Sequence, residues 1–193
     1  MGIINKHDFV LCKRNENIRL RPMTDDDFDI LLKWNSDSDV LYWVEGDDIE
    51  SHSLADIQGI YGEVSKNAWC FIIEFSGIPV GECWLQKMNM PHIIEEFPDD
   101  IIYRIDIMIG DKNYWNQGIG TRVIRMLTDF GFKKQNANKI FYLPGDYNKR
   151  SIRAAEKVGY IIHAMIEVED NHKAKYDVNM MMTRIGYSDL YDW

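Results

Sequence analysis

A glycine-bearing turn lies between an apolar run and a segment with helical periodicity. The turn is Tyr114–Thr121 and contains the sequence Gly118-Ile119-Gly120. The apolar run Ile101–Ile109 precedes it, and apolar residues recur at helical spacing from Ile119 to Phe130. A strand, a Gly-x-Gly turn and a helix N-terminus together direct backbone N–H groups at an anion. The pattern therefore predicts an anion-binding site at this turn.

A single acid interrupts the apolar run. Asp106 stands among Ile105, Ile107 and Met108 in the expected strand. A carboxylate in apolar surroundings is costly unless a cation lies beside it. Two interpretations follow: Asp106 lies on a solvated face of the strand, or it binds a cationic substrate group and accepts its proton.

The charges of the chain are unevenly distributed. The formal net charge is −9, but residues 111–159 hold ten Lys/Arg and four Asp/Glu, whereas residues 37–110 hold three and fifteen. Such asymmetry suits one anionic and one cationic ligand, although solvated faces are the alternative. A nucleic-acid partner is disfavoured, because no long basic stripe accompanies the acidic total.

Length and composition favour one ordinary globular domain. The chain has 193 residues, of which 46% are hydrophobic and 27% charged. We expect a domain over residues 1–183 and a C-terminal tail, 184–193, with no predicted structure. No apolar stretch approaches membrane-spanning length, the N-terminus lacks a signal-peptide pattern, and the three cysteines lack metal-ligand spacing. We therefore expect a cytoplasmic protein with no membrane segment and no metal.

The elements that must position these residues come in a mixed order. We expect strands at residues 17–21, 69–75, 78–86, 101–109, 138–143, 160–168 and 176–183. We expect helices from Thr24 to about residue 35, from Ser51 or Ser53 to about 64, from the turn to about 135, and over 148–158; residues 87–100 should form a loop. This order predicts an α/β (α+β) fold with a mixed central sheet covered by helices on both faces.

The turn fits neither of two common nucleotide-binding motifs. A dinucleotide-binding fold needs a third glycine where Val123 stands. A P-loop is excluded because no Gly-Lys-Ser/Thr is present.

Residues 103–160 resemble the core of the GCN5-related N-acetyltransferase (GNAT) superfamily. That family binds the pyrophosphate of acetyl-CoA on an Arg/Gln-x-x-Gly-x-Gly/Ala turn, and the matching segment here is Trp115–Gly120. A second family signature matches Asn148 and Gly159-Tyr160. Within the superfamily the resemblance is closest to aminoglycoside 6′-N-acetyltransferases. It rests on the segments Tyr103–Asp106, Asn113–Trp115, Gly118–Arg122, Arg150–Ala154, Glu95-Glu96 and Glu45–Asp47.

The resemblance implies a fold in which a splayed strand pair holds acetyl-CoA, and it assigns the site residues. Backbone groups of Ile107 and Ile109 would hold the pantetheine arm, and Asn148 would contact that arm or an ordered water. The pyrophosphate would meet the backbone N–H groups of Gln117, Gly118, Gly120 and Thr121. Asp106 would be the catalytic base and an acceptor ligand. The other expected ligands of the polycationic aminoglycoside are Asp47, Glu95, Glu96 and Asp146.

Three residues depart from the family pattern. Ala155 stands where many members carry a Tyr that protonates the leaving thiolate, Trp115 replaces Arg or Gln, and Leu143 stands where related enzymes often have Asp. The leading hypothesis is transfer of acetyl from acetyl-CoA to the 6′-amino group of aminoglycosides, which confers resistance. The alternatives are a protein N-terminal or ribosomal-protein acetyltransferase, and a non-catalytic CoA-binding module. A monomer and a dimer are both compatible with the sequence.

Overall fold

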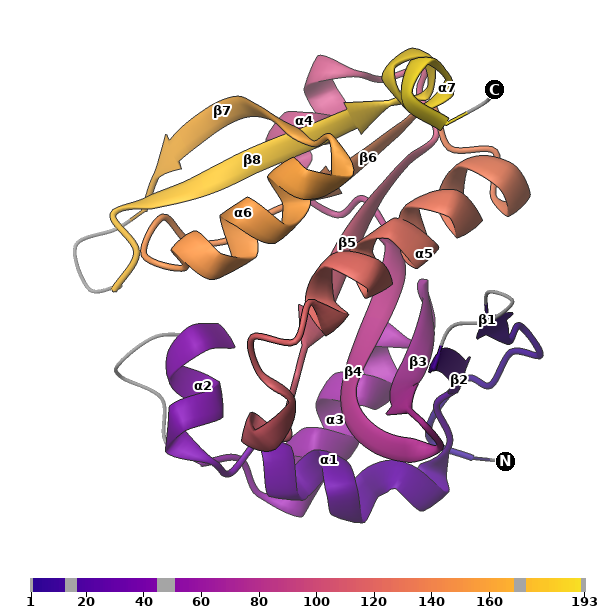
Figure 1. The fold of residues 1–193 in the computed structure, drawn as a ribbon, viewed down its shortest axis with the longest axis vertical. Helices are drawn as coiled ribbons and strands as arrows, with labels where there is room; N and C mark the ends of the chain where they lie inside the picture. The colour runs from indigo at the N-terminus through magenta and orange to yellow at the C-terminus, as the bar shows by residue number, and fades with distance from the viewer. Residues whose placement is uncertain (1, 13–16, 45–50, 169–172, 192–193) are drawn as a thin grey trace.

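The computed structural model contains an eight-stranded sheet (Figure 1) and describes residues 2–12, 17–44, 51–168 and 173–191. In sheet order the strands are β1 (Leu11–Cys12), β2 (Ile18–Pro22), β3 (Ala68–Phe75), β4 (Ile78–Lys87), β5 (Ile102–Met108), β6 (Lys139–Tyr142), β8 (Tyr176–Thr183) and β7 (Ile161–Glu167). Neighbouring strands are antiparallel except for β5 and β6, which are parallel. The sheet is therefore mixed, as predicted.

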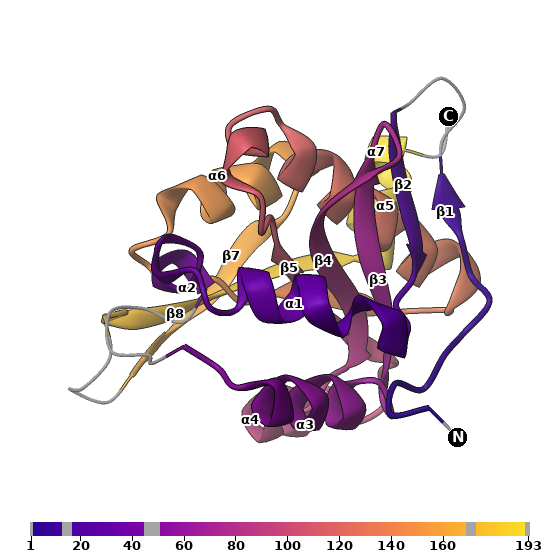
Figure 2. The same ribbon diagram turned by 90° about the horizontal axis from the view of Figure 1, so that it is seen from below.

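Helices cover both faces of this sheet, as Figure 2 shows from below. One face carries α5 (Ile119–Lys134), α6 (Lys149–Val158) and α7 (Arg184–Tyr191), whose apolar residues share the largest core cluster. The other face carries α1 (Phe28–Trp34), α3 (Leu54–Val64) and α4 (Pro91–Glu96) over two smaller clusters. Because side chains alternate along a strand, Ile105 of β5 enters the first cluster and Met108 the second. No helix within the described ranges is long and apolar enough to cross a membrane.

Several predicted helix boundaries are confirmed by their caps. The backbone N–H of Thr24 donates to Asp27 Oδ2 at 2.8 Å, which closes a capping box ahead of a short 3-10 turn, η1 (Asp25–Asp27), and α1. Ser53 caps α3 by accepting from the backbone N–H of Asp56. Gly159 ends α6 in the left-handed region with a φ of 98°. Local signals of this kind are readable without knowledge of the tertiary fold.

Three helical segments differ from the prediction. Residues 87–100, expected as a loop, contain α4, which starts at Pro91, a residue suited to the first helical turn. The segment Ser38–Val44 forms α2, a helix that was not predicted from the aromatic and acidic sequence of this region. Residues 184–191, part of the tail without predicted structure, form α7, and its Tyr187 is 2% exposed. Burial of Tyr187 against Phe132 is a tertiary contact with no local sequence signal.

Candidate active site

Strands β5 and β6 separate halfway along β5. β6 pairs with residues 102–105 of β5, ending where Tyr142 lies opposite Ile105, whereas β4 pairs with β5 as far as Met108. The Ile101 carbonyl accepts from the backbone N–H groups of Asn138 and Lys139 on the β6 side. The Ile102 carbonyl accepts from the backbone N–H of Met88 on the β4 side. Because backbone groups alternate in direction along a strand, those of Ile107 face the β6 side, beyond the end of the pairing. The separation thus exposes backbone N–H and C=O groups to a ligand.

The glycine turn meets this gap at the N-terminus of α5. Asn116 and Gly118 have positive φ values of 61° and 73°, and Gly118 is the N-cap of α5. The first helical hydrogen bond runs from the N–H of Arg122 to the carbonyl of Gly118. The N–H groups of residues 119–121 therefore have no acceptor within the helix. These N–H groups and the positive end of the helix dipole are suited to an anion, and anion binding at this turn stays a prediction.

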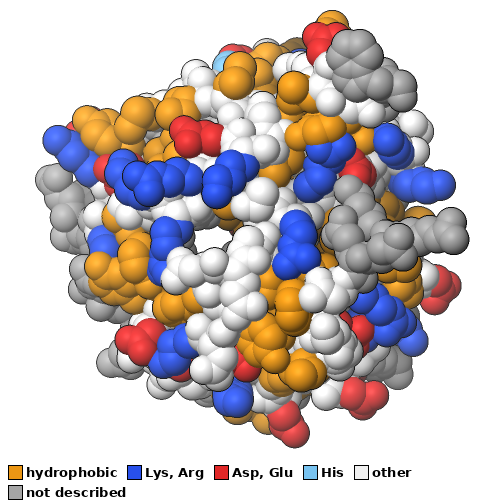
Figure 3. All heavy atoms as spheres, viewed as in Figure 1, with side chains coloured by type: hydrophobic (Ala, Val, Ile, Leu, Met, Phe, Trp, Pro, Cys, Tyr) orange, Lys and Arg blue, Asp and Glu red, His pale blue; other side chains and the backbone are white. Residues whose placement is uncertain are grey.

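A pocket of about 350 Å³ lies between this turn, the free end of β5, α2 and α6. Of the residues expected to bind the co-substrate, its lining includes Ile107, Ile109, Gly118, Gly120, Thr121 and Asn148. Gln117 is not part of the lining, and its side-chain amide donates to the Asn113 carbonyl. Among the described residues, the lining contains three cationic side chains, Arg150, Arg153 and Lys157, and no Asp or Glu; residues 45–50, which follow Val44 of the lining, lie outside the described residues. Figure 3 shows Lys and Arg side chains gathered around a hollow on this face of the molecule.

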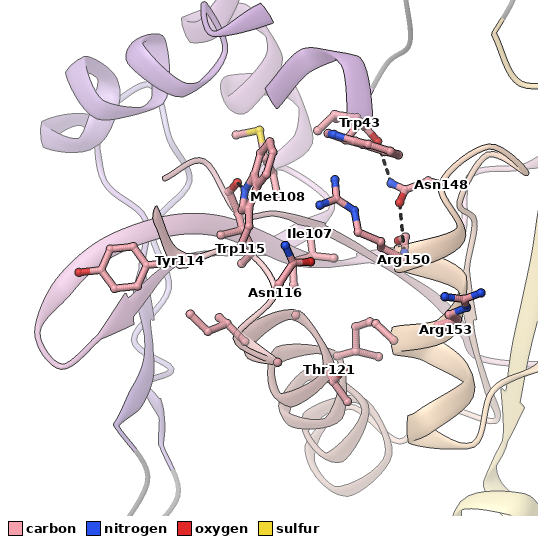
Figure 4. A pocket seen from close by; sticks show the side chains of 18 of the residues that line it. Trp43, Ile107, Met108, Tyr114, Trp115, Asn116, Thr121, Asn148, Arg150 and Arg153 are labelled. Atoms are coloured by element: carbon pink, nitrogen blue, oxygen red, sulfur yellow. Dashed lines mark hydrogen bonds between the residues drawn. The ribbon is translucent and has the colours of Figure 1, made fainter. Parts of the chain in front are cut away.

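Asn148 connects two walls of the pocket. Its Oδ1 accepts from the Ser151 N–H at 3.1 Å, and its Nδ2 donates to the Trp43 carbonyl at 2.9 Å (Figure 4). Asn148 therefore caps α6 and holds α2 against it. The prediction that Asn148 contacts the pantetheine or an ordered water stays a prediction, but its amide is already engaged within the protein.

An Arg side chain lies between two Trp rings at the pocket. The Arg150 guanidinium carbon is 4.1 Å from the ring centroid of Trp43 and 5.2 Å from that of Trp115 (Figure 4). Trp115 also donates from Nε1 to the Ile109 carbonyl at 2.7 Å. This bond fixes the turn to the end of β5, so Trp115 has a structural role where family members have Arg or Gln.

Asp106 lies on the opposite face of β5 from α5. It is paired in register with Trp84 of β4, and Arg104 binds both of its oxygens, with Nε–Oδ2 at 2.8 Å and Nη2–Oδ1 at 3.0 Å. Our treatment of Asp106 as a lone acid was therefore wrong, because residues two apart on a strand share a face and Arg104 supplies a cation. The Asp106 side chain is still 30% exposed, which leaves it open to a ligand on that face.

Three of the other predicted acceptor ligands lie outside the pocket lining. Glu96 pairs with His163 at 3.0 Å, Asp146 accepts from the Lys175 N–H at 3.0 Å, and Glu95 is exposed on α4. Asp47 falls outside the described residues. Their contacts with an acceptor therefore stay predictions.

A buried acid escaped the sequence analysis. Glu82 of β4 is 4% exposed and lies opposite Met108 in register. The pKa of Glu82 is raised to about 8. Burial is the largest cause and the charge of Asp106 also raises the pKa, whereas a hydrogen bond from Tyr61 lowers it. Among the described residues, Glu82 Oε2 has no hydrogen-bond partner. Like Asp106, Glu82 is an acid within an apolar strand, so the same signal was present in the sequence at Glu82.

The family of the chain follows from its similarity to known proteins. Residues 17–161 match the Acetyltransferase (GNAT) domain. The chain belongs to the GNAT family. Acetyl-CoA is the acyl donor of GNAT enzymes, which confirms the co-substrate expected from the sequence. The three cationic side chains of the pocket lining fit the phosphates of that molecule.

Individual GNAT proteins are similar over most of the chain. An aminoglycoside N(6′)-acetyltransferase type 1 from Klebsiella pneumoniae is 26% identical over 183 residues, which cover 92% of this chain and 89% of that one. The spermidine N(1)-acetyltransferase of Escherichia coli (strain K12) is 23% identical over 149 residues, covering 76% and 74%. A solved structure of AAC(6′)-Ib in complex with ribostamycin and coenzyme A matches with a TM-score of 0.76 at 24% identity, covering 91% and 98%. The GNAT fold predicted from the sequence is thus confirmed.

Two pocket hydroxyls were also missed. Tyr142 and Ser151 both line the pocket, and their hydroxyl oxygens are 2.5 Å apart. Burial is the main cause that raises the pKa of Tyr142 to about 12, so its hydroxyl keeps its proton at neutral pH. Ala155, at the position of the family Tyr, is fully buried and has no group that can donate a proton.

Proposed function

We propose that this GNAT enzyme transfers the acetyl group of acetyl-CoA to the 6′-amino group of aminoglycosides and thereby confers resistance to them. The observation that carries the proposal is a separation of charge across one strand. Ile107 lines a pocket whose described residues include three cations and no acid, while the adjacent Asp106 presents a carboxylate on the other face of β5. A donor rich in phosphate and a cationic acceptor can therefore approach the free end of β5 from opposite faces.

The chain's own groups suit each requirement of acetyl transfer. When bound, acetyl-CoA supplies a thioester carbonyl that a neutral amine attacks. The backbone N–H of Ile107, which faces the gap, would stabilise the carbonyl oxygen as it becomes negative. Asp106, held in place by Arg104, would orient the amine and accept its proton. The N–H groups at the start of α5, together with Arg150 and Arg153, would hold the phosphates.

Polyamines are a second candidate acceptor class. The observation in their favour is the similarity to the spermidine N(1)-acetyltransferase of Escherichia coli. Spermidine is a polycation, so the acidic region 37–110 suits it as well as an aminoglycoside. A protein N-terminal acetyltransferase is less suited, because a peptide terminus has no need of a multiply acidic surface. A non-catalytic module would leave the Asp106 carboxylate without a chemical role.

Thiol release from acetyl-CoA with a panel of acceptors separates these functions. The panel contains a kanamycin-type aminoglycoside, spermidine, a peptide with a free N-terminus and no acceptor. We expect the aminoglycoside to give the highest kcat/KM, and we expect expression of the chain in a susceptible bacterium to raise resistance to it. Turnover with spermidine alone would assign the polyamine function. Absence of turnover with every acceptor would contradict an acetyltransferase active on any of these amines.

A further inference from the structure

Tyr142 occupies the point where the sheet opens. It is the last residue of β6 and lies opposite Ile105, two residues before the free backbone of Ile107. Its side chain belongs to the core cluster on the α5 and α6 face, which also contains Ile105, and it lines the pocket. The Tyr142 hydroxyl is thus on the same side of the sheet as the phosphate-binding groups and close to the gap.

A second hydroxyl supports this one. Ser151 of α6 lies 2.5 Å from the Tyr142 oxygen, and its backbone N–H is held by Asn148. When Ser151 donates to Tyr142, the Tyr142 proton is free to point into the pocket. Burial keeps that proton in place across the neutral range. Tyr142 is therefore a neutral donor, oriented by Ser151, in a pocket that also presents cations and the start of α5.

The chemistry of acetyl transfer requires a donor on the thiol side. As the new C–N bond forms, the C–S bond breaks and its electron pair stays on sulfur. The negative charge that develops there is stabilised by any donor held at that position. We propose that Tyr142 is a catalytic residue whose hydroxyl donates a hydrogen bond to the leaving sulfur of acetyl-CoA. This inference rests on the proposed acetyl transfer and adds the group that stabilises its leaving thiolate.

The proton balance of this step is simple. A Tyr hydroxyl with a pKa of about 12 is a weaker acid than an ordinary thiol, with a pKa of about 8.5, so the proton stays on Tyr142. Coenzyme A then leaves as the thiolate and takes a proton from solvent, while the acceptor amine gives up one proton to Asp106 or to water. The step therefore balances in protons, and it needs no proton donor at position 155, where the buried Ala155 stands.

The first test measures the bound coenzyme A thiol, not turnover. We would titrate the ultraviolet absorbance of the thiolate in coenzyme A bound to wild type and to Tyr142→Phe. The hydrogen bond stabilises the thiolate, so we expect the thiol pKa to be higher in Tyr142→Phe by about one unit, a tenfold change in its ionisation equilibrium. The charge of Asp106 acts on both proteins and does not enter the comparison.

The second test measures single-turnover acetyl transfer with the amine that wild type uses best. We expect Tyr142→Phe to be slower by roughly 10- to 100-fold at unchanged acetyl-CoA affinity. Tyr160→Phe is the matched control: Tyr160 is equally buried and bonded to a hydroxyl, Thr128 at 2.9 Å, but lies outside the pocket lining. It should leave both the rate and the bound thiol pKa unchanged.

A further variant keeps the proposal testable if Tyr142→Phe does not fold. Ser151→Ala retains Tyr142 and removes only its partner, so the rate and the thiol pKa should change in the same directions by smaller amounts. Two results together would overturn the inference: a rate within about twofold of wild type and a thiol pKa within about 0.3 units of wild type, both on the order of experimental error. They would be measured in folded Tyr142→Phe or, if that variant does not fold, in Ser151→Ala. The thiol titration needs no acceptor, so failure of the aminoglycoside assay alone contradicts the proposed function and leaves this test intact.

Discussion

Arg104 holds both carboxylate oxygens of Asp106, with contacts of 2.8 and 3.0 Å, on the face of β5 opposite α5. The pairing keeps the carboxylate oriented in the absence of an acceptor. Because the side chain is 30% exposed, an incoming ammonium group can share the charge of Asp106 with Arg104. In the proposed acceptor site Asp106 would thus be a fixed anion, and that property can be tested directly.

Asp106→Asn should impair catalysis without impairing donor binding. The amide is nearly isosteric but neither carries charge nor accepts a proton, so we expect kcat/KM for the aminoglycoside to fall at least roughly tenfold. The dissociation constant of acetyl-CoA should not change. Asp129→Asn is the control, because Asp129 is also paired with an Arg, Arg125 at 2.9 Å, but lies outside the pocket lining. Wild-type kinetics in Asp106→Asn would remove Asp106 from the site.

Gly120→Ala tests thermal stability and acetyl-CoA binding independently of each other. The nearest atom to an added Cβ is Ile107 Cδ1 at 4.0 Å, and the backbone at Gly120 is not left-handed, so Ala is accommodated in the helix. Ala favours a helix over Gly by about 0.5–1 kcal/mol, and we expect an unchanged or higher Tm. The family's Gly-x-Gly/Ala turn allows Ala at this position, so the added methyl group should leave acetyl-CoA affinity as in wild type.

Gly59→Ala is the matched control for that variant. Gly59 is also helical, exposed on α3, and has no atom within 4 Å of an added Cβ. Its Tm should rise in the same way while acetyl-CoA affinity stays constant. Loss of acetyl-CoA affinity in Gly120→Ala but not in Gly59→Ala would contradict the match of this turn to the family motif.

Arg153 should contribute to donor binding by its charge. It lines the pocket, whereas Lys149 on the same helix does not. We expect Arg153→Ala to weaken coenzyme A binding roughly five-fold or more and Lys149→Ala to have little effect, because a charge-assisted contact needs proximity to a phosphate. Calorimetric titration at low and high salt checks this, since the difference between the variants should shrink as salt rises. Equal effects of both substitutions would indicate only a general charge effect.

The buried Glu82 should make stability depend on pH. Its pKa is about 8 in the folded protein, against about 4.3 in an unfolded chain. Between these values the folded state binds more protons, so the free energy of unfolding falls as pH rises towards 8 and then levels off. Glu82→Gln removes this titration. Relative to wild type the variant should gain on the order of 3 kcal/mol between pH 5 and pH 9 in urea unfolding.

Glu63→Gln provides the comparison for Glu82. Glu63 lies on the surface of α3 beside Lys66, so its replacement should leave the pH dependence as in wild type. Parallel pH profiles for wild type and Glu82→Gln would contradict a buried, proton-binding Glu82.

Features of the fold that depend on local sequence were predictable. The capping residues Thr24 and Ser53, the terminating Gly159 and the Gly118 turn each act through the backbone of their own segment. The strand–turn–helix geometry at Gly118 was predictable for the same reason, because the three segments are consecutive in the chain. Binding of the acetyl-CoA pyrophosphate at this turn, which the family resemblance implies, stays a prediction.

Features that join distant segments were not predictable in this way. The bond from Asn148 to the Trp43 carbonyl connects residues 105 apart, and it places α2 over the pocket. The stacking of Arg150 on Trp43 depends on the same contact. Both arise from packing that a single sequence does not encode locally. The Arg104–Asp106 pair is different, because strand alternation alone would have revealed it.

The central claim is tested most directly with a matched pair of acceptors that differ at one atom. Wild-type protein would be given acetyl-CoA with a 6′-amino aminoglycoside and, separately, with its analogue that carries a 6′-hydroxyl. We predict stoichiometric thiol release and a single product acetylated on the 6′ nitrogen, identified by NMR, from the first compound, and background release from the second. Equal release from both compounds, or acetylation at another nitrogen, would contradict the assignment as an aminoglycoside 6′-N-acetyltransferase.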